Sequence, residues 1–182
     1  MIGCVNSTRE AKVLKTAGCQ VIIAQGVEAG GPRQFFENPH EASQIGLMAL
    51  LPPVVRVCGD VSVVASGAMM TAKSMMAAMM LGASGVEVGS LLVRTDESAW
   101  PKAMKDQVPW CDDAATRLTD MTNGRMTRVV LTGLAEALAG AGLEAAPYPG
   151  QLKALHTVYE AAQAQGRLDL MEMPLGQAAQ TA

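Results

Sequence analysis

Small residues follow two apolar segments of this sequence. Residues 63–68 read VVASGA and residues 86–90 read VEVGS, so Gly67 and Gly89 each come at or just after the end of a mostly apolar segment. Glycine has no Cβ, which lets a ligand approach the backbone N–H groups of such a loop. An N–H-rich loop that leads into a helix suits an anion, typically a phosphate. The residues therefore indicate a phosphate cradle, although the same pattern is as typical of short βα turns.

The titratable residues exclude several other kinds of site. The sequence has two histidines, His40 and His156, so a multi-histidine metal site is excluded by number. Its four cysteines are scattered without a C-x-x-C pair: Cys4, Cys19, Cys58 and Cys111. That spacing argues against a zinc or iron–sulfur centre. We expect reduced, mostly buried cysteines in a cytoplasmic protein and no metal.

Composition restricts the class of protein. At 182 residues the chain is long enough for one domain with a real core, but short of the ~250 residues of a complete β/α barrel. A net charge of −3 and 3% aromatic residues argue against nucleic-acid binding. No apolar run reaches the ~18 residues of a membrane span, and the N-terminus does not resemble a signal peptide. We therefore expect neither nucleic acid nor membrane among the partners.

Alternating strands and helices must position the glycine loops. Apolar, β-branched runs predict strands, and capped segments rich in good helix formers predict helices between them. The expected strands are 2–5, 21–24, 61–65 and 86–88, and the expected helices between them include 9–16 and 71–81. Such alternation calls for a parallel sheet with helical crossovers, which is an α/β fold.

Two helical segments carry more specific expectations. Residues 46–57 have helical spacing, but Pro52 and Pro53 interrupt it, so we expect that helix to begin at one of the prolines. The helix at 71–81 is rich in methionine, which we interpret as a soft face packed on the sheet rather than a metal or cofactor site. The methionine pairs at i, i+4 spacing are Met75–Met79 and Met76–Met80.

The alternation stops after residue 98. We expect short or long helices at 101–107, 131–141 and 151–165, a polar segment at 116–128 that is extended, and a loose tail at 171–182. Residues 35–44 are polar and irregular, as in an exposed loop. The expected organisation is residues 1–98 as βα units, with 99–182 as a mostly helical extension that packs on the same domain.

Three motifs, in order and with compatible spacing, resemble those of nitronate monooxygenases, formerly called 2-nitropropane dioxygenases. Residues 25–31 (QGVEAGG) resemble the family's QG-x-EAGGH loop, and residues 63–68 resemble its V-I-A-(A/S)-G-G strand and loop. Residues 82–98 (GASGVEVGSLLVRTDES) resemble GA-x-GV-x-MGT-x-F-x-x-T-x-ES. Weaker matches, among them Leu175-Gly176-Gln177, extend the resemblance over almost the whole chain. The resemblance implies an FMN-dependent oxidoreductase on a β/α barrel that oxidises alkyl nitronates with O2.

The resemblance also implies which residues bind FMN. Gln25 and Gly30 would flank the flavin, and Gly67 and Ala68, beside Ser66, would present N–H groups to its phosphate. The implied remainder of the pocket is Glu87, Val88, Gly89, Ser90 and Gln177. Ala68 stands where the family has its second glycine; if that position needs a positive φ, alanine costs about 1 kcal/mol or more.

The histidine that follows EAGG in the family is replaced by Pro32. The resemblance gives that histidine a role beside the flavin, as a base or as an electrostatic partner of the substrate. Proline has no titratable group, so we assign no catalytic residue. His40 lies eight residues further on and is more typical of a solvated loop histidine than of a replacement base.

The resemblance aligns the first strand of this sequence with the fifth strand of the family's barrel. We therefore expect a half-barrel with two open sheet edges, which favours self-association or a partner that covers it. The alternative to an enzyme is a truncated, non-catalytic remnant or subunit that binds FMN or another phosphorylated ligand. A different phosphate-binding barrel, similar to inosinate dehydrogenase, ranks lowest because no cysteine occupies a matching loop.

Overall fold

A computed structural model of the chain describes residues 1–36 and 44–181. The chain divides into two compact units, of which the first comprises residues 1–29 and 33–89 and the second residues 30–32 and 90–182. Each unit has its own hydrophobic core. Most of the loop expected at 35–44, including His40, lies outside the described residues.

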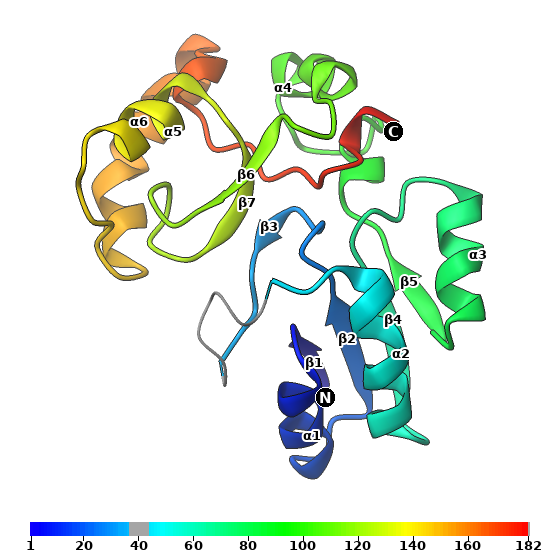
Figure 1. Ribbon diagram of the computed structural model, residues 1–182. Coiled ribbons are helices and arrows are strands. Elements are labelled where there is room, and N and C mark those ends of the chain that lie inside the picture. Colours follow the sequence, from blue (N-terminus) through cyan, green and yellow to red (C-terminus); the bar gives the residue numbers. More distant parts are fainter. Residues whose placement is uncertain (37–43, 182) are drawn as a thin grey trace. The chain divides into compact units, whose positions relative to one another are not determined.

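The first unit alternates strands and helices in the predicted order (Figure 1). Its elements are β1 (Ile2–Val5), α1 (Thr8–Thr16), β2 (Val21–Gln25), α2 (Leu47–Cys58), β4 (Ser62–Ser66), α3 (Ala72–Met80) and β5 (Gly85–Glu87). The four strands form one sheet in the order β1-β2-β4-β5, and every pair is parallel. The predicted parallel α/β architecture is therefore confirmed.

Side-chain caps begin two of these helices. The Ser7 hydroxyl accepts a hydrogen bond from the Glu10 backbone N–H at the start of α1, at 3.2 Å. Thr71 and Ser74 form a reciprocal capping box at the start of α3. Both caps satisfy N–H groups that a helix cannot pair internally, which explains why α1 and α3 begin where the sequence predicted.

Helix α2 corrects the expectation that its prolines start a helix. It begins at Leu47 and continues through Pro52 and Pro53. Each interior proline costs roughly 3 kcal/mol and removes one backbone hydrogen bond. Leu50, Leu51 and Val54 are buried on the same helix, and full burial of each side chain contributes about 1.5–3 kcal/mol. The apolar stripe therefore outweighs the prolines.

The methionine face of α3 is also different from the expectation. Met76, Met79 and Met80 are exposed, Met80 at 87% of its surface, while Ala78 is the buried residue of this helix. Alanine at the contact lets the helix lie close to its neighbours, which turns the longer methionine side chains outward. The interpretation of a methionine face packed on the sheet is therefore wrong for Met76, Met79 and Met80, whereas Met75 packs against the core.

The two faces of the parallel sheet differ in burial. Val5, Ile22, Ala24, Val63 and Ala65 are buried in the core with the apolar residues of α2. The alternate residues point to the opposite face, because successive side chains of a strand alternate. The strand register aligns Cys4, Ile23 and Val64 in one row on that face, and all three are only partly buried. A transverse row of this kind is how side chains fill the interior of a β/α barrel.

The second unit is built around a three-stranded antiparallel sheet, in the order β3-β7-β6. Its elements are β3 (Gly31–Pro32), η2 (Ser90–Leu92), α4 (Lys102–Gln107), η3 (Val108–Trp110), β6 (Thr116–Thr119), β7 (Thr127–Val130), α5 (Gly133–Gly140), α6 (Gly150–Gln165), η4 (Leu168–Leu170) and η5 (Ala179–Thr181). The expected helices are confirmed, whereas the segment expected to be extended at 116–128 is strand only at its two ends, with a turn between β6 and β7. The pairing of β3 with β7 was not predicted, because the two strands are far apart in sequence.

The C-terminal segment corrects a second expectation. Met171, Met173, Leu175 and Ala179 are buried, and all four belong to the core of the second unit. The backbone N–H of Val130 also donates to the Met173 carbonyl at 2.8 Å. The residues described up to position 181 are therefore packed, and the expected loose tail is wrong. Alternate spacing of the first three apolar residues is the sequence signal for this packing.

Candidate functional site

The carboxyl ends of the four parallel strands meet at one edge of the first unit's sheet. Gln25 ends β2, Ser66 ends β4 and Glu87 ends β5, and the register pairs Gln25 with Ser66 and Ser66 with Glu87. These three polar side chains form the next row beyond Cys4, Ile23 and Val64 on the same face. In β/α folds this edge is where ligands bind.

Gln25 is the most constrained residue of this row. Its side-chain oxygen accepts hydrogen bonds from Asn6 Nδ2 at 3.0 Å and from Arg33 Nη1 at 3.1 Å. The same two donors also reach the Gln25 backbone carbonyl, at 2.9 and 3.3 Å. The row therefore begins with a buried amide whose orientation is set by its neighbours.

The donors belong to a buried polar cluster that comprises Asn6, Glu10, Gln25 and Arg33, of which sequence reasoning predicted only Gln25. Glu10, on α1, accepts from the backbone N–H of Asn6 at 2.7 Å and of Phe36 at 2.8 Å. All four cluster side chains are buried, although two of them are charged. A sequence signal existed for Asn6, because it is polar and directly follows a predicted strand.

The loop after β4 has the geometry of an anion cradle. Gly67 and Ala68 have φ angles of +121° and +55°. Among the turn and loop hydrogen bonds of the described residues, none is donated by Gly67, Ala68 or Gly89. A Cβ at Gly89 would also meet nothing within 4 Å. Gly89 is exposed and Ala68 is partly exposed, whereas Gly67 is buried.

Ala68 has a positive φ, a conformation in which alanine is unfavourable. It is the one non-glycine residue of the described chain with a positive φ. In this region Cβ lies too close to the following carbonyl oxygen, which costs roughly 1–2 kcal/mol. The backbone at Ala68 is thus held in a conformation that glycine adopts more readily.

The remaining predicted site residues lie in the second unit. Ser90 Oγ accepts a hydrogen bond from the Gly176 backbone N–H at 3.0 Å, next to Gln177. A Cβ at Gly30 would lie 2.5 Å from that same N atom. Gly30 is therefore required for close packing against the C-terminal segment. Ser90, Gly30 and Gln177 are brought together within this unit, whereas Gln25, Ser66–Ala68 and Glu87–Gly89 belong to the first.

Pro32 occupies the end of β3 and is paired in register with Thr127 of β7. Its ring carries no exchangeable proton, so this position supplies neither a base nor a cation. Proline also lacks a backbone N–H and is found on edge strands, and β3 is the edge of its sheet.

Glu28, in the same loop motif, supports the fold. Both of its carboxylate oxygens accept from the Leu47 backbone N–H, at 3.0 and 3.1 Å. Gly46, the N-cap residue of α2, makes no side-chain cap, so a carboxylate from the preceding loop replaces it. A cavity of about 160 Å³ lies between this cap, the Gly67–Met69 loop and α3, and its lining is mostly apolar.

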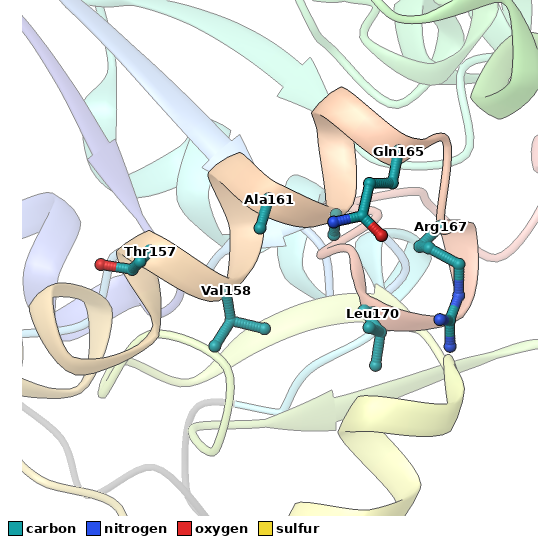
Figure 2. A pocket seen from close by; sticks show the side chains of 7 residues that line it. Thr157, Val158, Ala161, Gln165, Arg167 and Leu170 are labelled. Carbon is teal, nitrogen blue, oxygen red and sulfur yellow. The ribbon is translucent and has the colours of Figure 1, made fainter.

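A larger cavity, of about 300 Å³, has no predicted site residue in its lining. Figure 2 shows its lining side chains, from Thr157 on α6 to Leu170 on η4. The Arg167 guanidinium beside it is engaged with Asp169 through bonds of 2.8 and 2.6 Å. Its walls are largely apolar and no unpaired titratable group lines it among the described residues, so the cavity offers no chemistry of its own.

Near the predicted site, the Cys4 thiol has a strongly raised pKa. Burial, with a smaller contribution from Glu87, raises the pKa of its thiol to about 12. Cys4 therefore stays protonated and unreactive near neutral pH. All four cysteines are free. The described residues contain no cluster of metal-binding side chains and no helix long and apolar enough to cross a membrane.

Comparisons with known proteins give a consistent result. The sequence profile of the nitronate monooxygenase family matches residues 1–182. The chain is 33% identical over 177 residues to a nitronate monooxygenase of Pseudomonas aeruginosa, covering 97% of this chain and 50% of that protein. A probable nitronate monooxygenase of Bacillus subtilis is 30% identical over 177 residues, with 97% and 51% covered. The chain thus spans about half the length of the curated relatives it matches.

Solved structures show the same relation. A nitroalkane oxidase from Streptomyces ansochromogenes has a TM-score of 0.88 and 31% identity, over 100% of this chain and 52% of that one. FabK from Thermotoga maritima has a TM-score of 0.79 and 26% identity, over 98% and 54%. The fold is therefore that of about half of a TIM-type barrel protein.

Proposed function

This chain belongs to the nitronate monooxygenase family, and from that premise we propose that it binds FMN and oxidises alkyl nitronates with O2. The observation that carries the proposal is the pair of glycine loops at the carboxyl ends of β4 and β5, next to the row Gln25, Ser66 and Glu87. Because the chain spans half the length of its relatives, the activity of those longer proteins is a proposal for this chain.

The residues present fit a flavin mononucleotide. The N–H groups of Gly67, Ala68 and Gly89 suit its phosphate, and Glu87, whose carboxylate would repel a phosphate, suits the ribityl hydroxyl groups instead. Asn6 Oδ1 is buried and makes no hydrogen bond in the described structure. An unpaired buried acceptor is costly, and an N–H of the isoalloxazine ring would satisfy it. Within the second unit, Ser90, Gly30 and Gln177 form a separate set of predicted FMN contacts.

Bound FMN would supply the redox chemistry, as cofactors do, while the protein supplies position and electrostatics. The polar row and the cradle would orient the cofactor, and the apolar layer of Ile23 and Val64 would exclude water from beneath it. Pro32 leaves the site without the family's base. A nitronate is already an anion, so its oxidation requires no proton abstraction by the protein, and we expect preformed nitronates rather than neutral nitroalkanes as substrates.

A second candidate is a flavin- or phosphate-binding protein without turnover. The observation that favours it is Pro32, which lies in an ordered strand and removes the titratable group. Both candidates require the glycine loops to bind a ligand, but only the enzyme oxidises nitronate. One preparation of the protein can therefore be used to distinguish them.

The experiment is to purify the chain, add FMN and record the visible spectrum and O2 consumption with propyl-2-nitronate. A shifted flavin spectrum with nitronate-dependent O2 uptake supports the enzyme. A shifted spectrum without uptake supports the binding protein, and no retained flavin contradicts both the enzyme and a flavin-binding protein. Free FMN with propyl-2-nitronate in the same buffer is the blank, because it measures any O2 uptake that does not need the protein.

We also propose a macromolecular partner that covers the edges of the first unit's sheet. The sheet of the first unit ends at β1 on one side and β5 on the other, and Ile2 on β1 is 66% exposed. Parallel sheets are normally covered on both faces and at their edges. Self-association, or a partner chain, would cover these edges.

A further inference from the structure

The loop after β2 begins with a tight turn against the end of β4. The Gly26 N–H donates to the Ser66 carbonyl at 2.9 Å, which continues the pairing of β2 with β4. The Ala29 N–H then donates back to the Gly26 carbonyl at 3.1 Å. Residues 26–29 therefore form a turn that starts beside the last residue of β4.

Glu28, within this turn, is held at the start of α2. Both of its carboxylate oxygens accept from the Leu47 backbone N–H, at 3.0 and 3.1 Å. A Cβ at Gly46 would lie 3.2 Å from Oε1, and a Cβ at Gly26 would overlap with Oε2. The carboxylate therefore lies against two glycines and a helix N-terminus, whose dipole favours a negative charge. This side chain joins the turn to α2.

The residue after Glu28 packs on the glycine loop that follows β4. A Cβ at Gly67 would lie 3.2 Å from the Ala29 nitrogen and 3.5 Å from the Ala29 Cβ. Ala29 and Gly67 are both buried. Ala29 is therefore in direct contact with the residue that precedes Ala68, the alanine with a positive φ.

A cavity leaves the same loop room to move. Gly67, Ala68 and Met69 line a space of about 160 Å³ together with residues of α2 and α3. A positive φ at an alanine is strained, and such strain persists only where the surrounding structure enforces it. A cavity exerts no such constraint on the atoms that line it, so more of the constraint falls on the contact with Ala29.

We propose that Glu28 is a positioning residue for the phosphate site: by fixing Ala29 against Gly67, it holds Ala68 in the conformation that presents its N–H group to a phosphate. Ala68 is partly exposed and donates none of the turn and loop hydrogen bonds of the described residues. The inference rests on the proposed function in one respect, namely that the ligand of this loop is the phosphate of FMN. The hold of Glu28 on the loop is a property of the protein alone, so the two parts are tested by separate measurements.

The first measurement needs no flavin. In 13C,15N-labelled full chain, the Cα and Cβ chemical shifts of Ala68 report its backbone φ. Glu28→Ala removes the carboxylate, while the bond of 2.9 Å from the Val27 N–H to the Ile45 carbonyl remains to keep the turn folded. We expect the Ala68 shifts to move toward the values of a negative φ. In Glu28→Gln they should stay at their wild-type positions, because the amide oxygen still accepts from Leu47. Unchanged Ala68 shifts in Glu28→Ala would overturn the proposal.

Thr132→Ala is the matched control for the loss of a helix cap. Thr132 Oγ1 accepts from the Ala135 N–H at 3.4 Å at the start of α5, which belongs to the second unit. This variant should leave the Ala68 shifts unchanged. If it moves them as far as Glu28→Ala does, the effect is a general loss of stability and the proposal is wrong.

The second measurement compares the dissociation constants for FMN and for riboflavin, which lacks the phosphate, from quenching of flavin fluorescence. Glu28→Ala should weaken FMN binding about tenfold and riboflavin binding less than about twofold, because Glu28 acts through the phosphate site. Equal losses for the two flavins would show a merely structural role and overturn the proposal. If wild type binds neither flavin, the proposed function fails, and the Ala68 shifts alone decide whether Glu28 holds the loop.

A third variant covers the case in which Glu28→Ala does not fold. Ala29→Gly keeps the carboxylate of Glu28 and removes the methyl group that packs on Gly67. We expect the same direction of change in the Ala68 shifts and a loss of FMN affinity of about threefold, with riboflavin affinity unchanged. An Ala29→Gly protein with wild-type Ala68 shifts and wild-type affinity for both flavins would contradict the role we assign to this contact.

Discussion

At the scale of single residues, Ala68 is where the backbone of the cradle and the side chain conflict. The loop after β4 requires a φ of +55° there, and the family motif has glycine at this place. The sequence predicted the cost only conditionally, because the φ of a loop residue depends on what the loop connects. The structure shows that the φ of Ala68 is positive, so the cost applies.

We therefore expect Ala68→Gly to stabilise the protein. Removing Cβ from a left-handed residue relieves roughly 1–2 kcal/mol, of which the greater freedom of glycine in the unfolded chain takes back up to about 1. The net expectation is a gain of about 0.5–1 kcal/mol in the free energy of unfolding by urea. Gly18→Ala is the matched control, since Gly18 has a φ of +83° and open space around it; it should destabilise by a similar amount. A destabilised Ala68→Gly variant would contradict the strain.

Pro32→His tests the position that the family motif fills with histidine. If the pocket binds FMN, an imidazole on β3 would restore a titratable group beside the substrate. We expect nitronate-dependent O2 uptake to rise by about an order of magnitude, less than the 10²–10⁴-fold of general acid–base catalysis, because a preformed nitronate needs no proton abstraction. The gain should depend on pH near the histidine pKa of about 6.5. Pro32→Ala, which removes the ring but adds no titratable group, is the control. A flavin-loaded Pro32→His protein with wild-type turnover at every pH would refute the assignment.

Cys4 predicts how stability depends on alkaline pH. Its thiol has a pKa raised from 9.0 to about 12 in the folded protein. Between these values the unfolded chain has lost a proton that the folded chain keeps. Stability therefore falls as pH rises above about 9, by at most about 1.4 kcal/mol per pH unit from this group, and the contribution is fully present below that pH.

Urea unfolding at pH 8, 9 and 10 checks this expectation. Cys4→Ala removes the titrating group, so its decline over this range should be shallower than that of the wild type. Tyr159, whose pKa burial also raises, remains in both proteins and contributes equally above its ordinary pKa. Parallel declines would show that Cys4 does not titrate in this way.

At the scale of elements, α2 shows that tertiary packing can override a helix breaker. Its buried residues lie on one stripe, and Pro52 lies on the exposed side of the helix. The proline at this position removes a hydrogen bond to Met48 and contributes little packing. The helix forms because burial of its apolar residues outweighs the destabilising effect of Pro52.

Pro52→Ala should accordingly raise the free energy of unfolding by about 1–3 kcal/mol, the helix-propensity difference reduced by the greater entropy of the unfolded chain. Leu51→Ala, one residue earlier and fully buried, should lower it by roughly 2–5 kcal/mol. Thermal and urea unfolding of both variants would measure this contrast. A loss of stability in Pro52→Ala would mean that the ring makes contacts the helix needs.

The site could be predicted from sequence only in part. The ends of β2, β4 and β5 were predictable, because apolar runs followed by small or polar residues are local signals. Arg33 and Glu10 were not, since Arg33 meets Gln25 only after the loop between them folds back, and Glu10 meets Phe36 across 26 positions of sequence. From sequence alone, a charged residue is predicted to lie on the surface, because the partners that would satisfy it in the interior are not known.

At the scale of the whole molecule, the edge strands β1 and β5, each paired on one side only, predict self-association. Ile2→Lys places a charge on the β1 edge, a substitution that prevents strand pairing between chains, and should reduce the measured mass in light scattering. Met80→Lys, at an even more exposed position on α3, is the control and should leave the mass unchanged. A wild-type chain that is monomeric at every concentration would contradict self-association.

The sequence by itself determined the order of strands and helices, the parallel sheet and the place of the glycine loops. Caps, apolar runs and glycines act over a few residues, so they can be read without the fold. Only the tertiary structure decided that α2 continues through Pro52, that Met76 and Met80 face outward and that Leu175 is buried. It also decided that Arg33 holds Gln25. Each of these depends on contacts between residues distant in sequence, where burial of apolar surface and satisfaction of buried polar groups outweigh local preference.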